Sequence, residues 1–201
     1  IAGLPAGKPL VRARIVLAGD ERPGNDLDSA RVRIGPGPLA ITEIQFHPAA
    51  GEGEWVEVLN RSGAAVDLVE FTLADRGAGR GVPRAFAPLP ADSFAVLAQD
   101  RAAFLGRHPG LDTARVVAVA PWSALNNSDD ASGIADEVVI RERDDTPSDR
   151  VAYSARGVPA GTPLERDPAG DFVPAAAAGG SPLRPRPPLP LVPERFRLGA
   201  R

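Results

Sequence analysis

Seven short apolar runs, each bounded by residues that favour turns, follow one another between residues 41 and 154. Runs of this length that are rich in valine, isoleucine and phenylalanine are typical of β-strands. In order, they are ITEIQF, EWVEVLN, VDLVEFTL, SFAVLA, RVVAVA, EVVIRE and RVAYS. Glycine and proline, at 21 and 22 of the 201 residues, exceed their usual combined share of about 12%. The sequence therefore predicts an all-β fold in which two sheets face each other as a β-sandwich.

One short helix is predicted between the fourth and fifth runs. Asp100 can accept hydrogen bonds from the free amides of a helix over Arg101 to Arg107, and Pro109 ends it. Phe104 and Leu105 can then pack inward. We expect a connector between strands rather than a layer of the fold.

The run EWVEVLN is apolar on both sides. Because side chains alternate along a strand, Val56 and Val58 share one face, whereas Trp55 and Leu59 share the other. Such a strand is typical of the middle of a sheet. Glu57 lies between Trp55 and Leu59, so its partly hydrated carboxylate needs a donor, either an arginine or backbone amides. No matched acid or base accompanies it, so we interpret Glu57 as part of a sheet-pinning ion pair rather than a catalytic group.

Residues 8–34 contain two strand-like segments, LVRARIVLA and SARVRI, on either side of a polar loop. We expect a β-hairpin, which is marginally stable alone and must therefore rest its apolar face on another domain or chain. The loop DERPGND resembles the turn in the last hairpin of bacterial adhesion-type β-sandwich repeats. This resemblance implies that residues 1–38 are the remnant of a preceding β-sandwich domain. The segment GPGPL at residues 35–39 is typical of a domain junction.

The last part of the chain, residues 176–201, is rich in proline and poor in large apolar residues. We predict an extended arm with polyproline II character. Five arginines and one glutamate give residues 181–201 a charge of +4, against −3 for the whole chain. Its PxxP spacings suit an aromatic groove on a protein partner, and a spacer to a further domain is the alternative. The candidate partner-binding residues are Arg184, Arg186, Pro187, Pro188, Arg195 and Arg197.

Residues 41–75 combine a strand, an acidic glycine-rich loop, a Glu-Trp-aliphatic-Glu strand ending in Asn, and a Val-Asp-Leu turn. Further motifs are LPADSFAVLA, LNNSDD, EVVIRERDD, RVAYS and GTPLERDP. In order and spacing they resemble a bacterial lamin-tail domain over residues 40–175. The resemblance implies an immunoglobulin-like β-sandwich, which we place at residues 39–175. The sequence departs from the family near Phe71, where a tryptophan or similar ring is usual, and in the long turn LNNSDDASGIADE.

The residues that carry most enzyme chemistry are scarce in this chain. There is no cysteine, and the two histidines, His47 and His108, each precede a proline in a predicted turn rather than forming a His-x-x-x-His metal motif. No GxSxG motif is present, and GAGRG at residues 77–81 opens no helix, as a phosphate-binding loop must. We therefore predict no catalytic residues, no organic cofactor and no small-molecule substrate.

Acidic turns are the remaining candidates for ligand binding. Asp129, Asp130 and Asp136 lie in one turn region, and Asp144 and Asp145 lie in the next. Carboxylate oxygens at this density suit a calcium ion, although no EF-hand spacing is present. Solvated turn acids are the alternative interpretation.

The net charge and the hydropathy of the chain limit the kinds of partner that it is expected to bind. A net charge of −3 argues against nucleic acid, and no apolar stretch approaches the roughly 20 residues that cross a bilayer. The chain begins at Ile1 and contains no methionine, so we expect a processed or truncated piece. Together with the resemblance, this predicts a non-catalytic structural and protein-interaction module of a secreted or cell-surface bacterial protein, within a larger assembly. The alternative is an accessory domain, for targeting or substrate adhesion, of a larger secreted hydrolase such as a nuclease or phosphatase.

Overall fold

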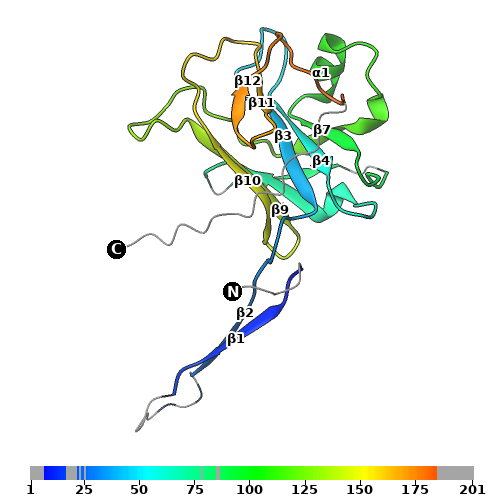
Figure 1. The fold of residues 1–201 in the computed structure, drawn as a ribbon. Coiled ribbons are helices and arrows are strands. Elements are labelled where there is room, and N and C mark those ends of the chain that lie inside the picture. Colours follow the sequence, from blue (N-terminus) through cyan, green and yellow to red (C-terminus); the bar gives the residue numbers. More distant parts are fainter. Residues whose placement is uncertain are drawn as a thin grey trace. The chain divides into compact units, whose positions relative to one another are not determined.

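The structure, a computed structural model, describes residues 7–16, 22, 24, 26–77, 79–84 and 87–184 (Figure 1). The chain divides into two compact units, and the division along the chain falls between Pro36 and Gly37. This position lies within the GPGPL segment. The described parts of the two units are a hairpin and a much larger β body.

The first unit holds the hairpin that the sequence predicts. Strand β1 (Leu10–Arg14) pairs in antiparallel fashion with β2 (Leu27–Arg31), and an isolated bridge joins Gly7 to Ile34. Every residue of both strands is exposed. The exposed aliphatic side chains are those of Leu10, Val11, Ile15, Val16, Leu27 and Val32. The hairpin therefore offers apolar side chains and two strand edges to solvent, and its origin in a preceding β-sandwich stays a prediction.

The second unit is a single sheet of ten strands, which confirms the all-β class. The strands are β3 (Leu39–Gln45), β4 (Trp55–Asn60), β5 (Phe71–Ala74), β6 (Arg80–Pro83), β7 (Phe94–Ala98), β8 (Val116–Ala120), β9 (Asp136–Glu142), β10 (Pro147–Tyr153), β11 (Leu164–Arg166) and β12 (Phe172–Pro174). Their order is β10-β9-β5-β6-β8-β7-β4-β3-β11-β12. The sheet curls so far that it is barrel-like (Figure 1).

Only β7 and β8 pair in parallel within this sheet, and their pairing explains the helix. Parallel neighbours need a long crossover connection, which here contains α1 (Arg101–Arg107) and the 3₁₀ turn η3 (Thr113–Arg115). Asp100 Oδ1 accepts hydrogen bonds from the amides of Ala102 and Ala103, both at 2.9 Å. The predicted helix, its bounds and its cap are confirmed.

Two hydrophobic clusters occupy the two faces of the sheet at β4. Val56 and Val58 belong to the larger cluster, whereas Trp55 belongs to a second cluster with Val96, Ala98, Phe104 and Val116. The ring of Trp55 meets that of Phe104 edge to face, with centroids 5.4 Å apart. The predicted division of β4 into two apolar faces is confirmed, and α1 covers the second of them.

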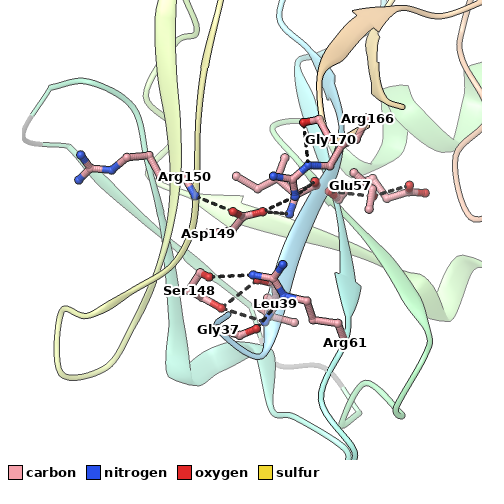
Figure 2. A network of polar contacts seen from close by, with 11 residues as sticks. Gly37, Leu39, Glu57, Arg61, Ser148, Asp149, Arg150, Arg166 and Gly170 are labelled. Atoms are coloured by element: carbon pink, nitrogen blue, oxygen red, sulfur yellow. Dashed lines mark hydrogen bonds and ion pairs between the residues drawn. The ribbon is translucent and has the colours of Figure 1, made fainter. Parts of the chain in front are cut away.

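The curled sheet is closed between β10 and β3 by side chains (Figure 2). Ser148 Oγ accepts from the amide of Leu39 at 2.8 Å and donates to its carbonyl oxygen at 3.0 Å. Asp149 Oδ2 accepts from the amide of Ile41 at 2.8 Å. Arg166 Nη1 of β11 bonds both to this Asp149 oxygen, at 2.8 Å, and to the Ile41 carbonyl, at 3.2 Å. Side chains therefore take the place of a backbone ladder, and we call this arrangement the side-chain closure.

Gly37 makes the close approach that the side-chain closure requires. A Cβ atom at this position would lie 2.3 Å from the Ser148 carbonyl oxygen, so no larger residue fits without a shift. Arg61, the residue after β4, stabilises this close approach. Its Nε donates to the Gly37 carbonyl at 2.8 Å, and its Nη2 donates to the Ser148 carbonyl at 3.2 Å. The second glycine of GPGPL thus belongs to the packing of the β body.

Candidate functional site

Three glutamates form a row across neighbouring strands on the face of the sheet that carries Trp55. In the strand register, Glu43 of β3 lies opposite Glu165 of β11 on one side and opposite Glu57 of β4 on the other. Glu43 and Glu57 have no exposed surface. Like charges directly opposite each other destabilise a sheet, and buried carboxylates need donors. This acidic row therefore has to be covered by groups that donate hydrogen bonds.

Three of these donors come from residues 179–184, a segment that we call the strap. The Leu183 amide donates to Glu57 Oε2 at 2.5 Å, and the Ser181 amide donates to Glu43 Oε1 at 3.0 Å. The Ser181 hydroxyl donates to Glu165 Oε1 at 2.8 Å. Each glutamate of the acidic row thus accepts a hydrogen bond from the strap. Another donor to Glu57 is the Thr42 hydroxyl, at 2.7 Å.

The strap fits the acidic row because of its backbone conformation. Gly179 and Gly180 have φ values of +80° and +67°, and Leu183 has +60°. At Gly180 a Cβ atom would lie 1.7 Å from Glu43 Oε1, so the backbone passes directly over the carboxylate. The Leu183 side chain packs on the hydrophobic cluster that contains Trp55. The described start of the predicted arm therefore forms turns and is docked on its own sheet, where the composition had suggested an extended polyproline II chain.

A buried polar cluster lies next to the strap at the end of α1. Glu52 Oε1 accepts from Trp55 Nε1 at 2.9 Å and lies 3.0 Å from His108 Nε2. The His108 ring stacks on Phe104, with centroids 4.4 Å apart. Burial raises the pKa of Glu52, but the hydrogen bonds from His108 and Trp55 outweigh it, and the pKa lies below its ordinary value. His108, which the sequence places in a simple turn, is thus also part of this buried cluster.

The pKa of Glu54, two residues further along the chain, is shifted in the opposite direction. Its Oε2 accepts from Trp122 Nε1 at 2.6 Å and from the Leu125 amide at 2.9 Å. Burial is the dominant influence and raises the pKa of Glu54 above its ordinary value, despite these hydrogen bonds. The pKa values of these two neighbouring carboxylates are therefore shifted in opposite directions.

Replacing these two glutamates with glutamine is expected to change the pH dependence of stability in opposite directions. The lowered pKa of Glu52 adds stability above its unfolded value of 4.5, and this stability is lost as the pH falls through the folded pKa. The raised pKa of Glu54 adds stability below 4.5, and this stability is lost as the pH rises. Relative to wild type, Glu52→Gln should lose more stability at pH 7 than at pH 3, whereas Glu54→Gln should lose less stability at pH 7 than at pH 3. Urea titrations at both pH values measure this, and parallel pH profiles would contradict it.

In the structure, each proposed calcium ligand forms hydrogen bonds or an ion pair with other groups of the protein. Asp129 accepts from the Ser154 hydroxyl and Asp130 from the Ser132 hydroxyl, while Asp136 accepts from three amides. Asp144 accepts from the Thr146 amide, and Asp145 pairs with Arg80. Hydrogen bonds from Ser132 and Arg76 hold the pKa of Asp130 well below its usual range. Within the described ranges, no three acidic or histidine side chains converge as metal ligands, and calcium binding stays a prediction.

Of the candidate partner-binding residues, only Arg184 lies within the described part of the chain. It is exposed, and its amide donates to the Ser181 carbonyl at 3.3 Å, so it belongs to the strap. Arg186, Pro187, Pro188, Arg195 and Arg197 lie outside the described residues. The candidate site thus consists of the acidic row and the strap that covers it.

The sequence indicated some parts of this site and missed others. Backbone amides were among the donors predicted for Glu57, and the Leu183 amide is one of them. Glu57 is fully buried, however, and not partly hydrated, because the strap covers it. Glu43 and the strap were missed. The signal for Glu43 was its place within the apolar run ITEIQF, like that of Glu57 within EWVEVLN.

Comparison of the chain with protein-family models, with curated proteins and with solved structures finds no match. The lamin-tail resemblance therefore stays a prediction. In the described residues, no helix has the length and apolar character needed to cross a membrane.

Proposed function

We propose that this chain is a non-catalytic structural and protein-interaction module of a secreted or cell-surface bacterial protein. In this proposal, the β body is an immunoglobulin-like domain of the lamin-tail kind that presents the proline-rich arm, its loops and its strand edges to protein partners. The observation that carries the proposal is the strap on the acidic row, because it fixes the root of the arm to the sheet.

A fixed root favours binding by the residues that follow. Residues 181–201 carry five arginines against one glutamate, so their charge is opposite in sign to that of the whole chain. Proline-rich segments in general lose less conformational entropy on binding than other segments do. Such an arm suits an acidic or aromatic groove on a partner protein.

The hairpin supports the same function by different means. Its exposed side chains include those of Ile15 and Val16, at 69% and 84% exposure. Exposed strand edges can pair with a neighbouring chain, and clustered exposed aliphatic side chains mark interaction surfaces. In this proposal the molecule therefore has two surfaces for contact with other chains, the arm and the hairpin.

Two truncations test the proposal. Deleting residues 185–201 leaves the strap in place, so it should weaken assembly while the melting temperature stays within about 1 °C of the wild-type value. Deleting residues 179–201 also removes three hydrogen bonds to the acidic row. This second deletion should lower the free energy of unfolding by about 2–3 kcal/mol. Sedimentation velocity reports assembly, and urea titration reports stability.

The proposal is wrong if the shorter deletion leaves the sedimentation of every species unchanged. Hydrolysis of a phosphate or carboxylate ester by the purified chain, abolished by a single substitution, would also contradict it. The matched control is a chain in which the arginines of residues 185–201 are replaced with lysines. It keeps the charge and the prolines but loses the planar guanidinium groups.

A further inference from the structure

The outer edge of β1 has no neighbouring strand in the part of the chain that the structure describes, because β1 and β2 form a sheet of two strands (Figure 1). Pro9 and Ile15, on either side of β1, both bond to the opposite half of the hairpin. The Pro9 carbonyl accepts an amide hydrogen bond at 3.1 Å, and the Ile15 amide donates one at 2.9 Å. Backbone groups of an antiparallel pair alternate in direction from one residue to the next. The outward N–H and C=O groups are therefore those of Leu10, Arg12 and Arg14.

The edge of β1 is more open than the other edges of the hairpin. On β2, the outward amide of Ser29 already donates to Asp28 Oδ1, at 2.8 Å. Just before β1, the Lys8 carbonyl already accepts from Arg31 Nη1, at 3.2 Å. Within the described ranges, no such bond uses the outward backbone groups of β1 itself. Three alternate residues of β1 can thus each pair with an added strand.

One face of the hairpin carries arginines and no acid. Cross-strand neighbours share a face, so the register groups together Leu10, Arg12, Arg14, Leu27, Ser29 and Arg31, which we call the basic face. Asp28 lies opposite Ala13 and belongs to the other face. Among the described residues, Arg12 and Arg14 have no carboxylate partner. Because like charges on neighbouring positions of a sheet repel each other, the basic face favours a carboxylate beside them.

The other face of the hairpin is aliphatic along β1. Val11, Ala13 and Ile15 alternate with the arginines and are all exposed. Side chains of a strand added to β1 would also alternate, so one set would lie beside the arginines and the other beside these aliphatic groups. Opposite charges and aliphatic pairs on neighbouring strands each stabilise a sheet. The strand that fits this edge therefore alternates acidic with aliphatic residues.

We propose that the outer edge of β1 binds an extended segment of a partner protein in which acidic and aliphatic residues alternate. Its backbone pairs with the outward groups of β1, and two of its carboxylates bind Arg12 and Arg14. A third strand also stabilises a hairpin that is marginal by itself. Antiparallel pairing with β1 of a second copy, centred on Arg12, would place two arginines opposite each other and is disfavoured. The inference rests on the proposed function and names the chemistry of one partner.

Fluorescence anisotropy with labelled heptapeptides tests the proposal on the full chain. The probe is TVEVEVT, whose two carboxylates lie on one face of a strand. The control TVEEVVT has the same composition but places them on opposite faces, and the control TVKVKVT reverses the charge. We expect TVEVEVT to bind at least about tenfold more tightly than either control. Its affinity should fall as the salt concentration rises, because exposed charges contribute.

Amide hydrogen exchange locates the added strand on the hairpin. Saturating TVEVEVT should slow exchange of the Arg12 and Arg14 amides at least about tenfold, because these amides gain acceptors. The Ser29 amide lies on the other edge and already has an acceptor, so its exchange should stay unchanged. Exchange that slows at Ser29 but not at Arg12 would place the peptide on β2 and would overturn the proposal.

Substitutions on the two edges separate backbone pairing from charge. Arg12→Pro removes an outward amide without removing a bond to β2, and it should weaken binding of TVEVEVT by at least about tenfold. Ser29→Pro, its matched control on the edge of β2, should leave binding unchanged. Arg12→Gln keeps the amide and should weaken binding by about fivefold, whereas Arg84→Gln, at an exposed arginine of the β body, should not. Slow exchange of the Val11 amide, which faces β2, shows that the hairpin is intact, and Arg12→Gln alone decides the question if Arg12→Pro disrupts it.

Three further outcomes would overturn the proposal: no binding of TVEVEVT, equal binding of either control peptide, or unchanged affinity in Arg12→Gln. A dimer of the free chain that dissociates in Arg12→Pro would assign the edge to a second copy and would also overturn it. The chain lacking residues 185–201 should bind TVEVEVT as the full chain does. Assembly that survives this deletion therefore counts against the proposed function, and absent peptide binding counts against the edge of β1 alone.

Discussion

Replacing Asp149 with alanine is expected to lower the free energy of unfolding by about 4 kcal/mol, because breaking a buried ion pair costs about 3–5 kcal/mol. Asp149 is 7% exposed and accepts hydrogen bonds from the Ile41 amide, the Arg150 amide and Arg166 Nη1. The alanine variant removes all three acceptor contacts at once. It also leaves the Arg166 guanidinium, whose side chain is only 17% exposed, without its carboxylate.

Further variants separate the charge of Asp149 from its hydrogen bonds. Asp149→Asn keeps one oxygen that can accept from the Ile41 amide and should lose about half as much stability. In a double-mutant cycle, adding Arg166→Ala should recover about 1–2 kcal/mol of the loss in Asp149→Ala. Asp144→Ala, in the exposed turn before β10, should lose less than about 0.5 kcal/mol. A loss below about 1 kcal/mol in Asp149→Ala would show that the side-chain closure does not hold the sheet.

Replacing Gly180 with alanine is expected to release the strap and to lower the free energy of unfolding by about 3 kcal/mol. The new methyl group would lie 1.7 Å from Glu43 Oε1 and 2.6 Å from Pro163 Cγ. The backbone at Gly180, with φ at +67°, is also one that alanine avoids. Because the strap cannot stay in place, the hydrogen bonds from Ser181 and Leu183 to the acidic row are lost with it.

Gly179→Ala is the matched control for this prediction. Its φ of +80° imposes the same backbone strain, but the nearest atom to a new methyl group is His108 Cε1, at 3.4 Å. We expect a loss of about 1–2 kcal/mol from the strain alone. Amide exchange of Ser181 and Leu183 should become at least about tenfold faster in Gly180→Ala and stay near wild type in Gly179→Ala. Equal losses and equal exchange in both variants would mean that the clash with Glu43 plays no part.

The elements that the sequence predicted are those set by neighbouring residues. Helix α1 follows from Asp100 before it and Pro109 after it, and the two faces of β4 follow from the alternation of Trp55, Val56 and Val58. Local signals of this kind do not fix which strands become neighbours. Leu39 and Ser148 are 109 positions apart, so their pairing could not be predicted from local sequence patterns. The single curled sheet follows from such distant contacts.

The strap shows why the candidate site could be predicted only in part. A segment with the sequence AGGSPLR has few large apolar residues, so its composition indicates a free arm. Its docking depends chiefly on backbone amides and on the absence of side chains at two glycines. These are properties of conformation, and they leave little trace in hydrophobic periodicity. Of the glutamates in the acidic row, only Glu57 was singled out from the sequence, as an acid within an apolar run.

The position of Gly37 has a mechanical consequence. The unit boundary lies at Pro36 and Gly37, and the Gly37 carbonyl is bonded to Arg61 while Leu39 is bonded to Ser148. Tension applied through the chain from its N-terminal side therefore reaches these hydrogen bonds before any other part of the sheet. Because these hydrogen bonds are few and lie at the very start of β3, we expect the start of β3 to separate early under load, both from β10 and from Arg61 after β4. A tether attached upstream of the β body would thus pull directly on the side-chain closure.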